Sequence, residues 1–487
     1  MLFLPLSIFT YLSILTYVIS IVLIVLVIMQ RKEPTATLAW ILTIVFLPIL
    51  GAIFYLWFGF GRIEQRVRKR QRSNERLAPS LHKLERTLID FKIVPENKVD
   101  QSVHADLLKV TENIGTFAVT RGNSIKLVTD PEAAFAQLEA AIASARDSIH
   151  MEYYIYRRDA TGKRIRDLLI EAAKRGVEVR LLVDGVGSWS IGDLFITPLL
   201  QAGAKFARYL PVTFLGRPWH WNLRNHRKLT IVDGTTGYIG SLNIGNEYRE
   251  RKGQTSDFYD YQIRCEGPVV QQLQEVFAGD WFFATGKNLV QERYFPLPVR
   301  HGTTLAQVVG GGPDQPRFTL HEMTCAAIQS ARTSVQIMTP YFIPDQALLI
   351  ALHTAALRGI HIEIILPRRM LSVHERIVRL AGRSYYEDLL SYGIRLYEYL
   401  PGFLHTKSII VDTSWASVGT ANMDIRSFRL NFEVNLNLYS TELASVLERN
   451  FEESKADCEE IHASTFSKRP LSERCLENTL RILSPIL

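Results

Sequence analysis

An internal duplication limits the possible folds of this chain more than any other feature of its sequence. Three segments of the first half recur in the second half in the same order. They are residues 142–149 and 328–335, residues 174–183 and 357–366, and residues 203–211 and 393–401. One such similarity could arise by chance, but three in one order indicate that the chain forms two similar lobes.

Each half alternates short apolar segments with an amphipathic one. We expect strands at residues 149–156 and 177–183 in the first half, and at residues 335–343 and 360–366 in the second. The amphipathic segment between them ends in Arg-Gly in both halves, and glycine suits a helix C-terminus. This alternation is typical of a parallel sheet with helices on its faces. We therefore predict an α/β chain of two duplicated α/β/α lobes with mainly parallel sheets.

Both halves also carry the motif His-x-Lys-x4-Asp, followed by a Gly-x-x-Asn element that contains a small hydroxyl residue. The motif residues are His226, Lys228 and Asp233, then His405, Lys407 and Asp412; the hydroxyl and amide residues are Ser241 and Asn243, then Thr420 and Asn422. Side chains alternate along a strand, so a His and a Lys two positions apart point to the same face. Two identical copies inside a duplicated body indicate a shared function.

The chemistry of this set favours a phosphodiester substrate. A metal site is not expected, because lysine is not a usual ligand and the carboxylate falls on the far side of an apolar strand; no cofactor is predicted either. The G-x-S-x-G elbow of many serine hydrolases is missing from the sequence. Two ammonium groups and two amides would neutralise phosphate oxygens, while one imidazole attacks phosphorus and the other protonates the leaving oxygen.

These residues resemble the signature of the phospholipase D superfamily, which has two copies of His-x-Lys-x4-Asp, each followed by a Gly-Gly-x-Asn or Gly-Ser/Thr-x-Asn element. The resemblance covers about residues 130–487. It implies one site between the lobes, with His226 as the nucleophile that becomes a phosphohistidine and His405 as the general acid and base. The Asp of each motif tends to be structural in the superfamily, but we group Asp233 and Asp412 with the candidate catalytic residues. We expect Ser241 and Thr420, together with Asn243 and Asn422, to bind or support the phosphate. A carboxylate about 30 residues past each histidine orients the ring in relatives, and Asp260 and Glu433 match those positions.

Three places in the sequence bear on substrate contacts. Ser241 stands where many relatives have Gly in the first copy, and residues 367–374 lack an Asp expected in close relatives. Residues 212–225 combine aromatic side chains with arginines. That composition suits an interfacial loop beside anionic headgroups, packing between lobes, or stacking of single-stranded nucleic acid.

The N-terminal segment is apolar and almost free of charge. The first charged side chain is Arg31, and a second charge-free run covers residues 35–60. Each run exceeds the roughly 20 residues that a helix needs to cross a bilayer. A signal peptide would need a basic start and a shorter apolar core, so we expect a two-helix transmembrane hairpin. This segment, with Ala39-Trp40 and Phe58-Gly59, is similar to the N-terminal segment of bacterial cardiolipin synthases, a branch of the superfamily.

The net charge of +7 is concentrated just after this predicted hairpin. Residues 62–76 hold seven basic and two acidic side chains, whereas the loop between the predicted spans holds only two basic ones, Arg31 and Lys32. By the positive-inside rule the denser cluster is cytoplasmic. We therefore predict a multi-pass protein of the bacterial inner membrane whose lobes face the cytoplasm. The rest of the chain is nearly neutral, so its charge does not indicate nucleic acid as a partner.

These features divide the chain into four parts. We predict a transmembrane hairpin over residues 1–61, a basic juxtamembrane connector over residues 62–110, a first phospholipase D-like lobe over residues 111–300 and a second over residues 301–487. Residues 310–313, Gly-Gly-Gly-Pro, are expected to be a linker or turn, since the Lys-Ser/Thr of a phosphate-binding loop does not follow them.

The resemblance implies a phosphatidyltransferase activity. One phosphatidylglycerol would donate its phosphatidyl group through His226 to a second phosphatidylglycerol, which gives cardiolipin and glycerol. The expected partners are phosphatidylglycerol, other anionic phospholipids and the membrane, with no nucleic acid; the oligomeric state is unknown from the sequence. The alternatives are a phospholipase D that hydrolyses phospholipids to phosphatidic acid, and a membrane-tethered phosphodiesterase or nuclease.

Overall fold

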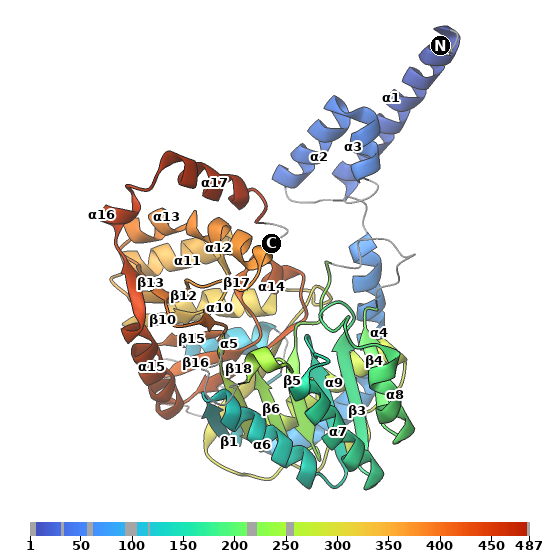
Figure 1. Cartoon of the computed structure of the whole chain (residues 1–487), viewed down its shortest axis with the longest axis vertical. Helices are drawn as coiled ribbons and strands as arrows, with labels where there is room; N and C mark the ends of the chain where they lie inside the picture. The colour runs from blue at the N-terminus through green and yellow to red at the C-terminus, as the bar shows by residue number, and fades with distance from the viewer. Residues whose placement is uncertain are drawn as a thin grey trace. The chain divides into compact units, whose positions relative to one another are not determined.

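The computed structural model describes residues 6–30, 34–55, 62–92, 105–114, 117–211, 222–249 and 258–484 (Figure 1). The chain forms two compact units, one of residues 1–70 and 213–221 and the other of residues 71–212 and 222–487. Most of the predicted interfacial loop, residues 212–221, lies outside the described residues. The predicted four-part division by residue number stays a prediction.

The first unit is helical. It contains α1 (Leu6–Met29), α2 (Pro34–Phe46) and α3 (Pro48–Phe54). Pro48 occupies the first turn of α3, where its missing N–H costs nothing, and a small core of Leu23, Val27, Ile44, Ala52 and Tyr55 joins the three helices. Among the described residues, no helix has the combination of length and apolar character that crossing a membrane requires. The predicted transmembrane hairpin is therefore not confirmed.

The second unit is built on one sheet that contains both halves of the duplication. In the first half the strand order is β4-β3-β2-β5-β6-β8-β1, and in the second it is β13-β12-β10-β15-β16-β18-β9, with β19 added at the far edge. The two series correspond strand for strand, and β1 and β9 pair antiparallel where the halves meet. The structure thus confirms the duplication that the sequence indicates.

The strands of the first half are β1 (Thr120–Val128), β2 (Ser148–Tyr153), β3 (Glu178–Asp184), β4 (Lys205–Tyr209), β5 (Lys228–Val232), β6 (Thr236–Gly240) and β8 (Gln262–Glu266). Those of the second are β9 (Thr304–Gly311), β10 (Ser334–Met338), β12 (His361–Pro367), β13 (Arg395–Tyr399), β15 (Ser408–Val411), β16 (Trp415–Gly419), β18 (Glu433–Tyr439) and β19 (Cys458–Ile461).

The prediction of mainly parallel sheets is wrong, because the sheet is mixed. Parallel pairing is limited to β2, β3 and β4 and to their counterparts β10, β12 and β13. β5 with β6 and β15 with β16 pair antiparallel because tight turns connect them. β2 and β10 also pair antiparallel, with β5 and β15. Asp233 and Gly234 turn from β5 into β6 with φ of 52° and 65°, and Asp412 turns from β15 into β16 with φ of 52°.

Helices cover both faces of each half of the sheet. In the first half, Ile149 and Met151 of β2 face the core formed with α6 (Pro131–Ser144), α7 (Ala160–Lys174) and α8 (Asp193–Gln201). His150 of the same strand faces the other way and stacks on Phe277 of α9 (Val269–Thr285), with ring centroids 4.7 Å apart. The second half repeats the arrangement with α10 (Thr319–Ser330), α11 (Gln346–Leu357), α12 (Val373–Arg383), α13 (Tyr386–Ser391) and α15 (Thr441–Ala456).

The corresponding helices α7 and α11 begin at the same kind of N-cap and end at the same Arg-Gly sequence. Asp159 caps α7 by accepting the N–H of Gly162 at 3.0 Å, and Asp345 caps α11 by accepting the N–H of Leu348 at 3.1 Å. Both helices end at the predicted Arg-Gly, where the glycines have φ of 93° and 84°. The remaining helices are α4 (Arg62–Glu85), η2 (Arg86–Phe91), α5 (Ala105–Ile114), η4 (Asn246–Tyr248), η5 (Glu292–Tyr294), α14 (Ile425–Arg429), α16 (Ala463–Phe466) and α17 (Leu471–Arg481).

Short backbone pairings cross between the halves. β7 (Phe258–Tyr259) pairs parallel with β14 (Phe403–Leu404), and Asn225 forms an isolated bridge with Phe432. β11 (Phe342–Ile343) pairs with β17 (Met423–Asp424) within the second half. The expected linker at residues 310–313 is wrong in part, because Gly310 and Gly311 belong to β9 and pair with β18. That strand continues the sheet from one half into the other.

Candidate active site

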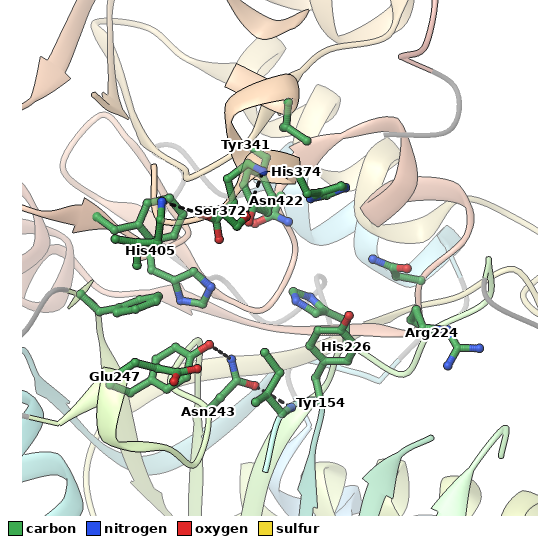
Figure 2. A pocket seen from close by; sticks show the side chains of 18 of the residues that line it. Tyr154, Arg224, His226, Asn243, Glu247, Tyr341, Ser372, His374, His405 and Asn422 are labelled. Carbon is green, nitrogen blue, oxygen red and sulfur yellow. Dashed lines mark hydrogen bonds between the residues drawn. The ribbon is translucent and has the colours of Figure 1, made fainter. Parts of the chain in front are cut away.

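The two motif histidines lie in one pocket between the halves of the second unit. Each precedes a central strand, His226 before β5 and His405 before β15. Both line a cavity of about 460 Å³, and Figure 2 shows their rings facing each other across it. The expectation that both motifs meet at one site agrees with this geometry.

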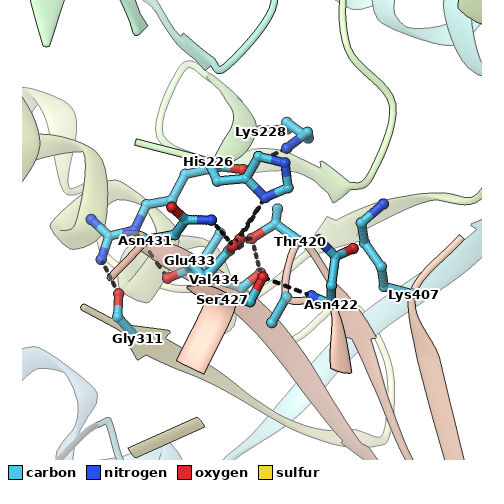
Figure 3. A network of polar contacts seen from close by, with 12 residues as sticks. His226, Lys228, Gly311, Lys407, Thr420, Asn422, Ser427, Asn431, Glu433 and Val434 are labelled. Atoms are coloured by element: carbon cyan, nitrogen blue, oxygen red, sulfur yellow. Dashed lines mark hydrogen bonds and ion pairs between the residues drawn. The ribbon is translucent and has the colours of Figure 1, made fainter. Parts of the chain in front are cut away.

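Each histidine ring is held by a carboxylate from the other half. Nδ1 of His226 lies 2.9 Å from Oε2 of Glu433, the first residue of β18 (Figure 3). Nδ1 of His405 lies 2.7 Å from Oδ2 of Asp260, which precedes β8. Both carboxylates that the sequence suggests lie beside a motif histidine, but each contacts the histidine of the other motif rather than the one that precedes it.

Backbone contacts fix this crossed arrangement. The N–H of His226 donates to the carbonyl of Phe432 at 2.9 Å, and the N–H of His405 donates to the carbonyl of Tyr259 at 2.8 Å. Phe432 and Tyr259 each precede an orienting carboxylate in the sequence. The cross-half pairings therefore place each carboxylate directly beside the opposite histidine.

The hydroxyl residues support the carboxylates rather than lining the cavity. Thr420 Oγ1 donates to Glu433 Oε2 at 2.6 Å, and Ser241 Oγ donates to Asp260. Asn431 adds a third hydrogen bond, from Nδ2 to Glu433 Oε1 at 3.2 Å. Ser241 and Thr420 were expected to bind or support phosphate, and in the structure both hydroxyls are directed to the carboxylates.

The charges and burial of these groups set their protonation. Burial lowers the pKa of His226 to about 4, against the opposing effect of Glu433, and burial lowers the pKa of His405 to about 3. Burial would raise the pKa of the two carboxyls, but the neighbouring histidines hold the pKa of Asp260 and Glu433 below their usual values. Near neutral pH each imidazole is thus neutral beside a carboxylate. Since a carboxylate only accepts, Nδ1 carries the proton and Nε2 keeps its lone pair.

The motif lysines lie behind the histidines. Lys228 and Lys407 are buried, and their Nζ atoms donate to the carbonyl oxygens of His226 and His405 at 2.6 and 2.5 Å. Burial lowers the pKa of Lys407 to about 8 and the pKa of Lys228 well below its usual value. Neither lysine lines the cavity in this structure, so each acts on the site through its charge and through the backbone of its histidine.

The two motif asparagines lie on opposite walls of the cavity. Asn243 is fully engaged, since Oδ1 accepts the N–H of Ile155 at 3.0 Å and Nδ2 donates to the hydroxyl of Tyr248 at 3.0 Å. Oδ1 of Asn422 is buried and finds no hydrogen-bond partner within the described part of the chain. Of the two, Asn422 has the acceptor that is available to a ligand.

Asp233 and Asp412, which we grouped with the reacting residues, lie elsewhere. Asp233 accepts the backbone N–H groups of residues 146–148, and Asp412 accepts those of residues 332–334. Both sit in the turns after β5 and β15, outside the residues that line the cavity. These hydrogen bonds hold the turn against the start of the neighbouring strand.

Several cavity residues belong to no motif. Tyr154, Arg224, Tyr341, His374 and Arg426 line it, and Figure 2 shows the first four of these around the histidines. Arg426 follows Asn422 by four positions, so alignment of the two halves would have drawn attention to it. His374 is the last residue of the segment 367–374, which lacks the Asp expected in close relatives. No group of three or more potential metal ligands is found among the described residues; the expected absence of a metal stays a prediction.

Comparison with known proteins identifies the family. The family described as "Cardiolipin synthase, PLD-like domain" matches residues 138–281 and 324–455, one stretch in each half, which together are more than half of the chain. The chain belongs to this cardiolipin synthase family. Both histidines and both orienting carboxylates fall within the matched stretches of the family. A second family, described as "Phospholipase_D-nuclease N-terminal", matches residues 18–59.

Relatives named as cardiolipin synthases are similar over nearly the whole chain. "Cardiolipin synthase" of Geobacillus sp. (strain WCH70) is 37% identical over 475 residues, which cover 96% of this chain and 92% of that protein. "Cardiolipin synthase 2" of Bacillus anthracis is 37% identical over 465 residues, which cover 94% and 88%. The crystal structure of phosphatidylserine synthase from Haemophilus influenzae Rd KW20 matches with a TM-score of 0.62 at 13% identity, covering 78% of this chain and 100% of that chain. That likeness supports the fold.

Proposed function

We propose that the protein is a cardiolipin synthase that transfers a phosphatidyl group from one phosphatidylglycerol to another through a phosphohistidine. The observation that carries this proposal is the pair of neutral imidazoles that face each other in one pocket, each fixed by a carboxylate, in a chain of the cardiolipin synthase family. Such a pair can act in turn as nucleophile and as acid and base.

The first step breaks the bond between phosphorus and the glycerol oxygen of the donor. Nε2 of His226 attacks phosphorus. Nε2 of His405, which takes up a proton when the anionic substrate binds, gives that proton to the leaving glycerol oxygen. The products of this step are free glycerol and a phosphatidyl group bound to His226. Glu433 and Asp260 stabilise the positive charge that each ring carries during the step.

The second step reverses the first with a different alcohol. A hydroxyl of the acceptor phosphatidylglycerol gives its proton to His405 and attacks phosphorus, and the bond to His226 breaks. Cardiolipin leaves and both histidines return to their starting state. If water replaced the acceptor, the same steps would give phosphatidic acid, so cardiolipin formation requires the acceptor to occupy the site first.

The charges of Lys228 and Lys407, which lie behind the histidines, would neutralise phosphate oxygens. Buried ammonium groups act strongly at short range because water does not screen them. Binding of the anionic phosphodiester in turn restores the charged form of the lysines and favours protonation of the imidazole that acts as the acid. This supports a substrate that carries one negative charge per phosphate.

We also propose that the protein works at a membrane, because both proposed substrates are lipids. The charge-free runs at residues 1–30 and 35–60 and the basic residues 62–76 support two spans with the lobes on the cytoplasmic side of the bacterial inner membrane. A fluorescent protein fused to the C-terminus should fluoresce in cells, and the Lys32→Cys variant should react with an impermeant thiol reagent added from outside. The opposite labelling would contradict this orientation.

The activity is tested with the purified full chain and vesicles of labelled phosphatidylglycerol. Cardiolipin and glycerol should form in equal amounts. Formation of phosphatidic acid without cardiolipin would favour the hydrolase alternative. Cleavage of DNA or RNA, with no effect on the lipid, would favour the nuclease alternative.

A further inference from the structure

The residues on either side of His226 are anchored by buried polar contacts with the first half of the sheet. The N–H of Asn225 donates to Oδ2 of Asp184 at 2.9 Å, and Nδ2 of Asn225 donates to Oε1 of Glu152 on β2. The N–H of Arg227 donates to Oδ1 of Asn225 at 3.1 Å. All of these anchoring residues are buried. The backbone is therefore fixed immediately before and after the histidine.

The side chain of Arg227 joins the start of β5 to α9, β9 and β18. Its guanidinium forms an ion pair with Asp280 of α9. Nη2 donates to the carbonyl of Gly311 at 3.2 Å, and Nε donates to the carbonyl of Glu433 at 3.1 Å. Glu433 is the residue whose carboxylate holds the His226 ring. One guanidinium thus ties the residue next to the histidine to the backbone of the orienting carboxylate.

Two buried carboxyls accompany this single guanidinium. No donor among the described residues reaches Oε2 of Glu152, yet the Glu152 carboxyl lies in hydrogen-bonding contact with that of Asp280. Two ionised carboxylates only accept hydrogen bonds, so this contact requires a proton between them. The ion pair with Arg227 favours the ionised form of Asp280, while burial and the adjacent Asp280 raise the pKa of Glu152 well above its usual value. The two carboxyls thus share one proton and carry one negative charge, which balances Arg227.

The equivalent positions of the second half are uncharged. They are Met338 for Glu152, Leu404 for Asn225 and Thr406 for Arg227. Thr406 is buried, and its hydroxyl finds no hydrogen-bond partner within the described part of the chain. Residues 400–404 connect β13 to His405, whereas residues 210–225 connect β4 to His226. A longer connection restricts its end less, so His226 depends more on side-chain anchors.

We propose that Arg227 and the proton-sharing pair of Glu152 and Asp280 are positioning residues, which hold His226 and Glu433 in the geometry for attack on phosphorus. The proposal rests on the proposed function, which makes His226 the nucleophile. None of the three side chains is among those that line the cavity, so they act through the His226–Glu433 pair and not on the substrate. The network should therefore control turnover and leave substrate binding unchanged.

Loss of one carboxyl of the pair should have a small effect. In Glu152→Gln the amide keeps the shape of the side chain and offers Asp280 an N–H in place of the shared proton. In Asp280→Asn, Glu152 releases its proton to solvent and becomes the anion that balances Arg227. Because one negative charge remains in each variant, we expect kcat within about fivefold of the unmodified chain.

Loss of both carboxyls should have a large effect. The double variant Glu152→Gln/Asp280→Asn leaves the Arg227 guanidinium buried without an anion, so its contact with the Glu433 carbonyl is no longer held in place. We expect kcat to fall about 100-fold or more, the usual cost of a misplaced reacting group, and KM to stay within about twofold. A product of two small single effects would mean that the carboxyls do not share a charge, and would overturn the proposal.

A third substitution separates positioning from stability. An unpaired buried charge destabilises the fold, and Arg227→Met added to the double variant removes that charge. The melting temperature should therefore rise above that of the double variant. Methionine cannot donate to the Glu433 carbonyl, so kcat should stay about 100-fold low. Recovery of kcat together with the melting temperature would mean that the network serves stability alone, and would overturn the proposal.

The matched control is Thr406→Val, at the position equivalent to Arg227 beside His405. It removes a hydroxyl that has no partner among the described residues, and kcat and KM should not change. Every rate is measured as consumption of labelled phosphatidylglycerol in vesicles, whichever product forms. Phosphatidic acid without cardiolipin would contradict the proposed transferase function, and the relative rates of the variants would still decide between positioning and stability.

Discussion

Nδ1 of His226 lies 2.9 Å from Oε2 of Glu433, a residue 207 positions further along the chain. The counterpart contact, between His405 and Asp260, spans 145 positions in the same crossed sense. Each half of the duplication thus supplies one histidine and the carboxylate for the other. Neither half holds a complete imidazole–carboxylate pair, which ties activity to the correct association of both halves.

Replacement of either histidine should abolish transfer. His226→Asn and His405→Asn each keep a polar side chain of similar size but remove the nucleophile or the acid and base. We expect cardiolipin formation to fall at least about 1000-fold in each variant, because groups that act as a unit fail together. Thermal unfolding should confirm that both variants fold. Substantial activity in either one would contradict a mechanism that uses both rings.

The orienting carboxylates should affect turnover more than binding. In Glu433→Gln and Asp260→Asn the amide can offer the ring the wrong hydrogen-bonding partner and cannot stabilise its charged form. We expect kcat to fall by about 100-fold or more, with KM little changed. Steady-state kinetics in mixed micelles would measure both constants. A change confined to KM would mean that these carboxylates bind substrate instead.

The motif aspartates should affect stability and not chemistry. Asp412→Asn weakens a set of hydrogen bonds from the backbone of residues 332–334, at a cost of about 1–3 kcal/mol. Those N–H groups, acting against burial, lower the pKa of Asp412. Its stabilising effect is therefore present above the unfolded pKa of about 3.9 and is lost as the pH falls through the lower folded value.

Denaturant unfolding of Asp412→Asn across this pH range would measure the effect. The difference from the unmodified chain should be full at pH 7 and shrink below about pH 4. The fraction that remains folded should turn over at the normal rate. Asp233→Asn, in the equivalent turn, serves as the companion variant and should behave alike at pH 7. A large fall in kcat with unchanged stability would mean that these aspartates take part in the reaction.

The pH profile of kcat/KM should be broad. His226, with a pKa lowered to about 4, stays neutral through mildly acidic pH, so the acid limb should lie well below the usual histidine value near 6.5. Lys407, with a pKa lowered to about 8, loses its charge above that pH, which predicts an alkaline limb there. Lys407→Arg should retain charge and move the alkaline limb to higher pH. An acid limb at pH 6.5 or above would contradict the low pKa of His226.

The proposed reacting residues follow from the sequence, whereas the pairing of each ring with its carboxylate does not. The repeated motif indicates His226 and His405, and the spacing after each motif indicates Asp260 and Glu433. Which carboxylate meets which ring depends on the long-range pairing of β7 with β14 and of Asn225 with Phe432. Those pairings leave no periodic pattern in the sequence.

Two other differences between the expected and the observed structure involve glycines whose roles can be explained. Asp233-Gly234 between two β-branched runs is a strong hairpin signal, and it predicts the antiparallel pairing observed between β5 and β6. Gly310 and Gly311 were assigned to a linker because of composition, but Gly311 lies against Leu320 of α10, where an added Cβ would approach that side chain to 2.5 Å. Close packing, rather than flexibility, accounts for that glycine.

The most direct test of the central claim is detection of the covalent intermediate. The purified full chain would be mixed with phosphatidylglycerol, quenched within milliseconds and digested, and the peptides that contain His226 and His405 would be examined by mass spectrometry. The account predicts one phosphatidyl group on the imidazole of His226 and no adduct in His226→Asn. Cardiolipin formation without any histidine adduct would contradict it.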